Sequence, residues 1–209
     1  MSAASEPPTA AARPRPQSAG LVEVERVDRA VYTAIAGTDT PRLDRAMRRL
    51  SRAADHSKLS ITAGAMLALS GGRRGRQAAV SGLASVAATA TIVNVLVKPV
   101  GRRRRPDRAT DQVPVDRQVR MPASRSFPSG HTAAATAFAS GVGRVWPVAG
   151  IPLQALAALV GYSRVHTGVH YPGDVLGGAL LGTMISDATA GVIAARRAPR
   201  GAGLPRRRG

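Results

Sequence analysis

The stretch Ser126–Thr132, Ser-Phe-Pro-Ser-Gly-His-Thr, brings a hydroxyl, a glycine and an imidazole together where a helix is expected to begin. Pro128 suits a position before or at the first helical residue, and Gly130 lets a ligand approach the backbone closely. The N–H groups at a helix N-terminus attract phosphate and other anions. The stretch therefore predicts an anion-binding turn with an acid at its edge, although the same residues can equally serve only to cap a helix.

Two further stretches carry charged residues beside apolar runs. Upstream, Lys98 follows a long apolar run, and Arg105-Pro106 follows Lys98 at a spacing of seven. Downstream, Ser163-Arg164 is followed by His170 and Asp174, with Tyr-Pro-Gly between the last two. Three of the four histidines of the chain fall in these two stretches and in Ser126–Thr132.

In order and spacing, the three blocks resemble those of the type 2 phosphatidic acid phosphatase superfamily of membrane lipid phosphatases. The Lys-x6-Arg-Pro pattern of that family matches residues 98–106, its Pro-Ser-Gly-His pattern matches 128–131, and its Ser-Arg-x5-His-x3-Asp pattern matches 163–174. Each block alone is common, whereas their joint occurrence is specific. The resemblance covers roughly residues 58–195.

The resemblance implies hydrolysis of a phosphomonoester without a metal or other cofactor. His170 would attack phosphorus to give a phosphohistidine, and Asp174 would hold its other ring nitrogen in the productive tautomer. His131 would protonate the departing alkoxide and then activate water. The phosphate oxygens would be held by hydrogen-bond donors, most of them cationic: Lys98, Arg105, Ser129, Gly130 and Arg164.

Each of these residues also has an ordinary structural interpretation. Arg105 ends a run of four arginines, any one of which can be a solvated charge, and Lys98 can simply extend from the end of a span towards water. His170 and Asp174 can cap the last helix. The chain has two lysines among thirty basic residues, so an ammonium retained at Lys98 favours a specific role.

The other two histidines are weaker candidates. His166 precedes His170 by four residues, which is a spacing that metal-binding pairs use, but no glutamate accompanies the pair and the residues around it are predicted to form a loop. His56, beside Asp55, is predicted to lie at the surface or the membrane interface.

Composition favours lipid over nucleic acid as the partner. The formal charge of +18 and the pI of about 11.9 suit either an anionic lipid surface or nucleic acid. Aromatic residues make up only 3% of the chain, so it has few side chains on which bases can stack, and without cysteine it has no thiol nucleophile. The apolar residues, 44% of the total, gather in long runs.

These runs predict an all-α, polytopic membrane helix bundle with about five spanning helices. Residues 1–20 are predicted to be a disordered tail, 21–57 two amphipathic helices at the interface, 58–195 the membrane-embedded phosphatase domain and 196–209 a basic disordered tail. The predicted spans are 58–72, 78–97, 131–143, 145–162 and 175–195.

This arrangement places the loops 98–130 and 163–174 on one face, where both charged blocks can meet. Arginines at the other end favour a cytoplasmic location for that end, so the catalytic face is predicted to be extracytoplasmic on the cell membrane. The expected substrate is a phosphate of an isoprenoid- or glycerol-based lipid, with a slight preference for the isoprenoid. The alternatives are an oxidative enzyme similar to vanadium haloperoxidases and a basic membrane protein without catalysis.

Overall fold

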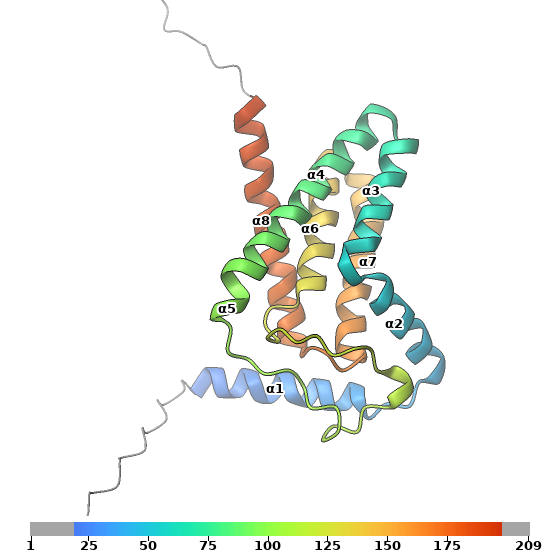
Figure 1. Cartoon of the computed structure of the whole chain (residues 1–209), viewed down its shortest axis with the longest axis vertical. Coiled ribbons are helices and arrows are strands. Elements are labelled where there is room, and N and C mark those ends of the chain that lie inside the picture. Colours follow the sequence, from blue (N-terminus) through green and yellow to red (C-terminus); the bar gives the residue numbers. More distant parts are fainter. Residues whose placement is uncertain (1–18, 198–209) are drawn as a thin grey trace, which may run out of the picture.

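All regular secondary structure in the computed structural model is helical across residues 19–197, the part of the chain that it describes. The predicted all-α class is therefore confirmed. Most of the long helices run side by side as a bundle (Figure 1). The bundle consists of α3 (Lys58–Ser70), α4 (Gly72–Thr91), α6 (Gly130–Val145), α7 (Pro147–His166) and α8 (Pro172–Arg197).

Three helical segments in the described part of the chain are long and apolar enough to cross a membrane, namely Gly72–Val100, Pro147–His166 and Pro172–Arg196. Helices α3 and α6, with 13 and 16 residues, are shorter than the ~20 residues that a full span needs. Helix α6 packs against α4, α7 and α8, so its neighbours in the bundle cover much of its surface.

Small residues bring α6 and α8 into close contact. A Cβ atom added at Gly178 would lie 2.6 Å from the carbonyl oxygen of Ser129, and one added at Gly182 would lie 2.3 Å from that of Ala133. Any larger side chain at these two positions would force the helices apart. The predicted role of the two glycines in helix packing is confirmed.

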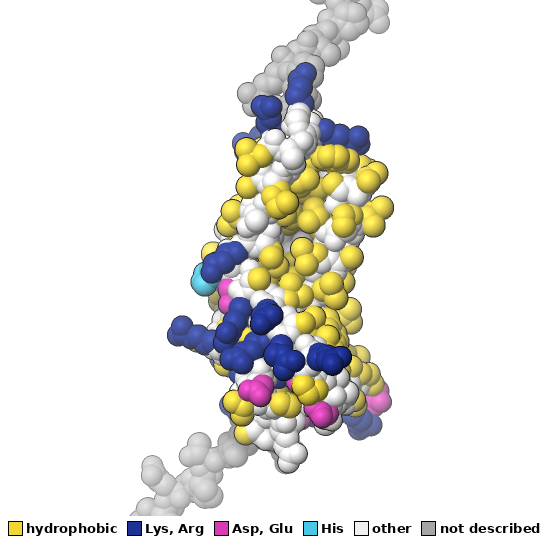
Figure 2. Space-filling view, turned by 90° about the vertical axis from the view of Figure 1, so that its right-hand side faces the viewer, with side chains coloured by type: hydrophobic (Ala, Val, Ile, Leu, Met, Phe, Trp, Pro, Cys, Tyr) yellow, Lys and Arg dark blue, Asp and Glu magenta, His cyan; other side chains and the backbone are white. Residues whose placement is uncertain are grey.

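The surface of the bundle is apolar between two basic zones. Figure 2 shows apolar side chains along one side, with Lys and Arg side chains gathered above and below them. Large apolar side chains exposed on α3 include Ile61, Met66 and Leu69. The exposed arginines include Arg73, Arg74 and Arg76 at one end and Arg42, Arg45, Arg49 and Arg52 of α2 (Pro41–Ala53) at the other.

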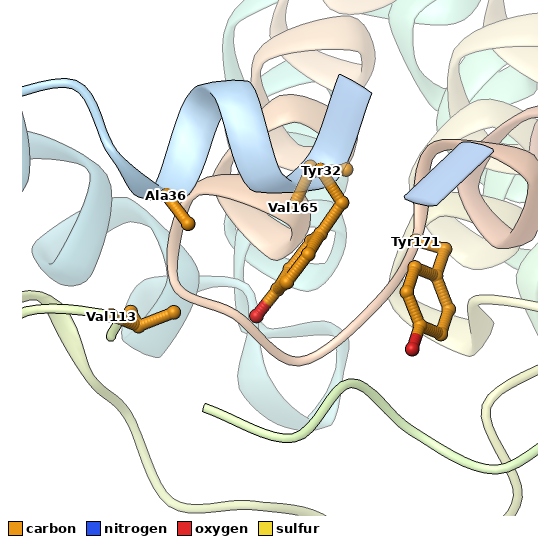
Figure 3. Close-up of a cluster of buried hydrophobic side chains, with 5 residues drawn as sticks. All are labelled: Tyr32, Ala36, Val113, Val165 and Tyr171. Carbon is orange, nitrogen blue, oxygen red and sulfur yellow. The ribbon is translucent and has the colours of Figure 1, made fainter. Parts of the chain in front are cut away.

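Helix α1 (Ala19–Ala36) lies across the end of the bundle (Figure 1). Its valines Val24 and Val27 are exposed, as an interfacial amphipathic helix requires. On the opposite side, Tyr32 is buried in a cluster that joins α1 to the end of α7 and to the loops beside it (Figure 3). The rings of Tyr32 and Tyr171 meet edge to face, with their centroids 5.3 Å apart.

Several helix ends differ from the prediction. The segment Gly72–Val100 is one continuous helix, made of α4, a π-helical stretch η2 (Ile92–Val97) and α5 (Lys98–Val100). The sequence predicts a connection at the arginines at its start, but arginine is a good helix former and the helix includes them. Similarly, α7 extends to His166, so Arg164 is helical instead of lying in a loop.

The predicted tails fall mostly outside the described residues. Helix α1 begins at Ala19, two residues before the predicted boundary, and α8 ends at Arg197, so the few tail residues that are described, next to these helices, are helical.

Candidate active site

The candidate site lies at the end of the bundle that α1 crosses. The loop of residues 101–129, which contains the short helix η3 (Val115–Arg117), runs across the ends of the helices here (Figure 1). Lys98 is the first residue of α5, the short helix that ends just before this loop, and His131 lies in the first turn of α6 after it. Arg164 lies in the last turn of α7. The three sequence blocks are therefore brought to one end of the molecule.

A tight turn after α7 positions His170. Gly168 has a φ angle of 71°, in the left-handed region that favours glycine. Its N–H group donates to the carbonyl oxygen of Val165 at 2.9 Å, and the N–H groups of Val169 and His170 donate to that of Arg164 at 3.1 and 3.2 Å. The turn thus fixes the backbone of His170 to the last turn of α7.

His170 and Asp174 form the pair that the third block predicts. Nδ1 of His170 lies 3.4 Å from Oδ2 of Asp174, slightly farther than a good hydrogen bond, and both side chains are almost completely buried. The other ring nitrogen, Nε2, lies 3.1 Å from Nη1 of Arg105. The imidazole therefore has its carboxylate on one side and a phosphate-binding candidate on the other.

Several donors hold the carboxylate of Asp174. Its Oδ2 accepts hydrogen bonds from the hydroxyl of Ser126 and, at 2.9 Å, from the backbone N–H of Tyr171. Its Oδ1 accepts one from Nη1 of Arg103 at 3.0 Å. Asp174 also lies in the first turn of α8, where the helix dipole favours a negative charge. These contacts keep the carboxylate ionised and fixed beside His170.

Arg103 links this carboxylate to α1. Its guanidinium also pairs with Asp28 of α1 and lies over the ring of Tyr171, with Cζ 4.4 Å from the ring centroid. Asp28 in turn accepts a hydrogen bond from the backbone N–H of Gly173 at 2.6 Å. Neither Arg103 nor Asp28 was singled out from the sequence. Arg103 lies inside the first block but is one of four consecutive arginines, and Asp28 lies far outside the blocks.

His131, the second histidine, has a carboxylate partner as well. Its Nε2 lies 2.9 Å from Oδ1 of Asp55, which belongs to the short helix η1 (Asp55–Ser57) between α2 and α3. The side chain of His131 is 25% exposed, so it remains open to solvent. No motif in the sequence indicates a role for Asp55, because it lies before all three blocks.

Arg164 is a buried cation with little compensation. Its side chain is 2% exposed, and its Nη1 donates to the hydroxyl of Ser51 at 2.6 Å. The nearest carboxylate oxygen, Oδ1 of Asp55, is 3.9 Å away, and Nε has no hydrogen-bond partner. An uncompensated buried charge is costly, and a bound anion would relieve that cost.

Arg105 is fixed by oxygen atoms on two segments. Its guanidinium donates to the carbonyl oxygen of Val169 at 2.7 Å and to the carbonyl oxygens of Ser124 and Arg125 at 2.8 and 3.2 Å. These contacts orient the guanidinium against His170. Burial lowers the pKa of Arg105, partly offset by the charge of Asp174, but an arginine remains cationic at neutral pH.

Lys98 and Gly130 line a cavity of about 210 Å³ beside His131. A Cβ atom added at Gly130 would lie 3.3 Å from Nζ of Lys98, so glycine keeps the helix start open to the ammonium. Asn94, from the π-helical turn, lines the same cavity, and such turns are frequent at functional sites. The remaining lining residues are Ala54, His56, Ser57, Thr89, Ala90, Val93 and Ala134.

Ser129 is fully buried, and its hydroxyl group is already engaged within the protein. Its hydroxyl accepts a hydrogen bond from that of Thr132 at 2.9 Å, and its backbone N–H donates to the carbonyl oxygen of Asp174 at 2.9 Å. The side chain makes no capping hydrogen bond to α6. Ser129 thus ties the start of α6 to that of α8, and its hydroxyl faces Thr132.

His166 belongs to a separate buried cluster. Its Nε2 lies 2.7 Å from Oδ1 of Asp44, which also pairs at 3.0 Å with Nε of the fully buried Arg117. Within residues 19–197, the acidic and imidazole side chains form no group of three or more able to hold a metal ion. His56 is exposed, in agreement with its predicted place at the surface.

The electrostatics of His170 suit a nucleophile. Burial lowers the pKa of His170 to about 4, an effect that the charge of Arg105 reinforces and that of Asp174 opposes. The ring is therefore neutral at physiological pH, so a lone pair is available on one nitrogen. A neutral imidazole can act as a nucleophile, and fixed cations around it can stabilise negative charge that develops on a substrate.

Comparison with known proteins identifies the family to which the chain belongs. Residues 78–197, more than half of the chain, match the model of the PAP2 superfamily. The chain belongs to that superfamily, and its relatives identify it as a phosphoric monoester hydrolase that acts on lipid phosphates.

Similar proteins include decaprenylphosphoryl-5-phosphoribose phosphatase of Mycobacterium tuberculosis, 35% identical over 75% of this chain and 82% of the relative. The protein of the same name from Mycolicibacterium smegmatis is 35% identical over 79% and 82%. A transmembrane PAP2-type phosphatidylglycerolphosphate phosphatase from Bacillus subtilis has the same fold, with a TM-score of 0.64, 26% identity, and coverage of 85% of this chain and 90% of that one.

Proposed function

We propose that this protein is a multi-pass membrane enzyme that removes a terminal phosphate from an isoprenoid-linked lipid through a phosphohistidine on His170. One observation carries the proposal: cations converge on two histidines, and few carboxylates lie close enough to neutralise them. Within residues 19–197, no carboxylate lies within ion-pair distance of Lys98 or Arg105, and the nearest one to Arg164 is 3.9 Å away. A phosphate dianion supplies the missing charge.

In the first chemical step, Nε2 of His170 attacks phosphorus and the bond from phosphorus to the ester oxygen breaks. Asp174 on the Nδ1 side holds the ring in the tautomer that leaves Nε2 unprotonated. His131 gives its proton to the departing alkoxide. Arg105, Arg164 and Lys98 bind the equatorial oxygens, on which charge is spread in the transition state.

In the second step, His131, now neutral, takes a proton from water, and the resulting hydroxide attacks the phosphohistidine. The bond from phosphorus to Nε2 breaks and inorganic phosphate leaves, so both histidines return to their starting states. All charge compensation comes from protein side chains. We therefore expect activity to survive chelators and to be inhibited by vanadate, which adopts the five-coordinate geometry of the transition state.

The fold supports a location in the membrane with the site at its surface. Three helices among the described residues are long and apolar enough to span, and α3 and α6 complete a five-helix bundle if the membrane is thinned locally or if neighbouring helices shield their ends. The arginines at the start of α4 lie at the end opposite the site, which favours a cytoplasmic location for them and an extracytoplasmic one for the site.

The preference for an isoprenoid lipid rests on the relatives and on the cavity. The mycobacterial relatives are named for a decaprenylphosphoryl substrate. The cavity beside His131 is lined partly by apolar residues of the helix that precedes Lys98, such as Val93, so a lipid chain can approach along the bundle while its phosphate meets the cations. Such remote binding energy can be used to position the phosphorus near His170.

The substrate proposal is tested by comparing three substrates with purified protein in mixed micelles. The substrates are a decaprenyl-linked sugar phosphate, a phosphatidate and a short water-soluble phosphomonoester at matched concentrations, and released phosphate is measured. We expect the isoprenoid substrate to have the highest kcat/KM and the soluble one to lose kcat as well as affinity. Equal efficiency toward all three would overturn the assignment as an isoprenoid lipid phosphatase.

A further inference from the structure

The catalytic histidine His131 contacts a carboxylate that lies outside the matched family region. Oδ1 of Asp55 is 2.9 Å from Nε2 of His131, and the family match begins only at residue 78. In the part of the chain that the structure describes, no other carboxylate lies within ion-pair distance of this histidine. The contact joins two elements far apart in the sequence, η1 and α6.

The other charged groups that face His131 are basic. Arg164 of α7 lies close enough to act on its charge, and the neutral ring of His170 lies nearby. Lys98 approaches from α5, with Nζ near the backbone of Gly130. Positive neighbours disfavour the imidazolium form, whereas an adjacent carboxylate favours it. An acid that must carry a proton in this surrounding therefore needs a negative partner, and Asp55 is positioned to be that partner.

The backbone around Asp55 also indicates a specific role. The two residues that follow it, His56 and Ser57, both have a φ angle of 57°, in the left-handed region that non-glycine residues rarely adopt. This turn stores conformational energy while it places Asp55 beside His131. The Asp55 side chain is 42% exposed, so the turn does not serve to bury it in a core.

We propose that Asp55 is a positioning residue for His131 and acts with it as a second carboxylate–histidine pair. The Asp55 carboxylate accepts the Nε2–H of His131, orients the ring and favours its charged form, so that Nδ1 exchanges the proton with the leaving oxygen and then with water. This inference rests on the proposed function, because it assigns a partner to the acid of that same reaction.

The test is the pH dependence of kcat and KM for Asp55→Asn, with released phosphate measured from a long-chain polyprenyl phosphate ester in micelles. Loss of the carboxylate should lower kcat by about tenfold or more near neutral pH with little change in KM. It should also move the basic limb of the kcat profile to lower pH by about one unit, because the imidazolium loses its partner. Asp55→Glu should restore part of the activity.

The matched control is Asp116→Asn, which removes the same charge from an exposed position in the 101–129 loop. It should leave both kcat and the pH profile unchanged. Circular dichroism and size-exclusion chromatography in detergent show whether the fold of each variant is intact. Asp55→Glu provides a second variant if Asp55→Asn does not fold.

An unchanged pH profile in Asp55→Asn would overturn the proposal. A lower KM with unchanged kcat would also overturn it, because Asp55 would then compete with phosphate for Arg164 instead of assisting His131. These outcomes concern Asp55 alone, since wild type remains active in the same assay. If wild type itself releases no phosphate from any lipid, the proposed function fails.

Discussion

Nη1 of Arg103 lies 3.0 Å from Oδ1 of Asp174, on the side of the carboxylate away from His170. The same guanidinium pairs with Asp28 of α1. Through this bridge, a helix with an exposed apolar face is connected to the carboxylate that orients the nucleophile. The orientation of Asp174 therefore depends on α1 as well as on the neighbouring residues of α8.

The first prediction concerns this bridge. Arg103→Gln should lower kcat by about ten- to a hundredfold, because a charge-assisted hydrogen bond to a buried carboxylate contributes about 1.5–3 kcal/mol. KM should change little, since Arg103 does not face the phosphate. Arg102→Gln, in the same arginine run but exposed, is the matched control and should keep normal turnover. Equal kcat values for the two variants would show that Arg103 has no role in orienting Asp174 for the reaction.

The second prediction distinguishes Arg105 from its neighbour Arg104. Arg105→Lys should lower kcat/KM by about a hundredfold, because an ammonium cannot reproduce the fork that bonds Ser124 and Val169 while facing His170. Arg104→Lys, at an exposed position, should retain near-normal kcat/KM. The measurement is phosphate release over a range of substrate concentrations. A comparable loss in both variants would mean that only the local charge density matters.

The third prediction concerns the charge of His170. Because burial lowers its pKa to about 4, the ring should stay neutral as the pH falls below the ordinary histidine value of 6.5 and should gain a proton only near pH 4. NMR spectra of histidine-labelled protein in detergent can follow the four histidine rings, and the His170→Asn variant identifies the signal. A His170 signal that titrates at or above pH 6 would contradict the structure of the site.

The fourth prediction concerns topology. The chain has no cysteine, so single cysteines can be introduced and labelled with an impermeant reagent in intact cells. Ala109→Cys and Ala123→Cys, both exposed in the 101–129 loop, should react from the same side of the membrane, and Arg73→Cys at the start of α4 should react only after permeabilisation. Reaction of all three from one side would rule out the spanning arrangement.

The residues at the centre of the candidate site could be predicted from the sequence because the three blocks have fixed internal spacings. The spacing of four between His170 and Asp174 brings the two side chains together across the turn that starts α8, and this relation is local. The helical class and the close packing at Gly178 and Gly182 likewise follow from local composition. Such features can be predicted without knowledge of distant contacts.

The residues that support the site could not be found in this way. Asp28 and Asp55 lie far along the chain from the groups they contact, and nothing in their own neighbourhoods marks them. Ser126 begins the stretch that contains the second block, but nothing there indicates its contact with the distant Asp174. Arg103 is hidden within four identical residues. The helix ends were misjudged for a related reason: charged residues such as Arg73 indicated a connection, although the helix continues through them at the bundle end.

The central claim, that His170 becomes phosphorylated, is tested most directly by mapping the phosphoryl group after a single turnover. Enzyme in excess is mixed with a long-chain lipid phosphate labelled at the terminal phosphate, quenched in alkali, in which phosphohistidine survives, and analysed by mass spectrometry. The account predicts label on His170 in wild type, and neither label nor phosphate release in a folded His170→Ala variant. Label on another residue, or near-normal phosphate release by His170→Ala, would contradict it.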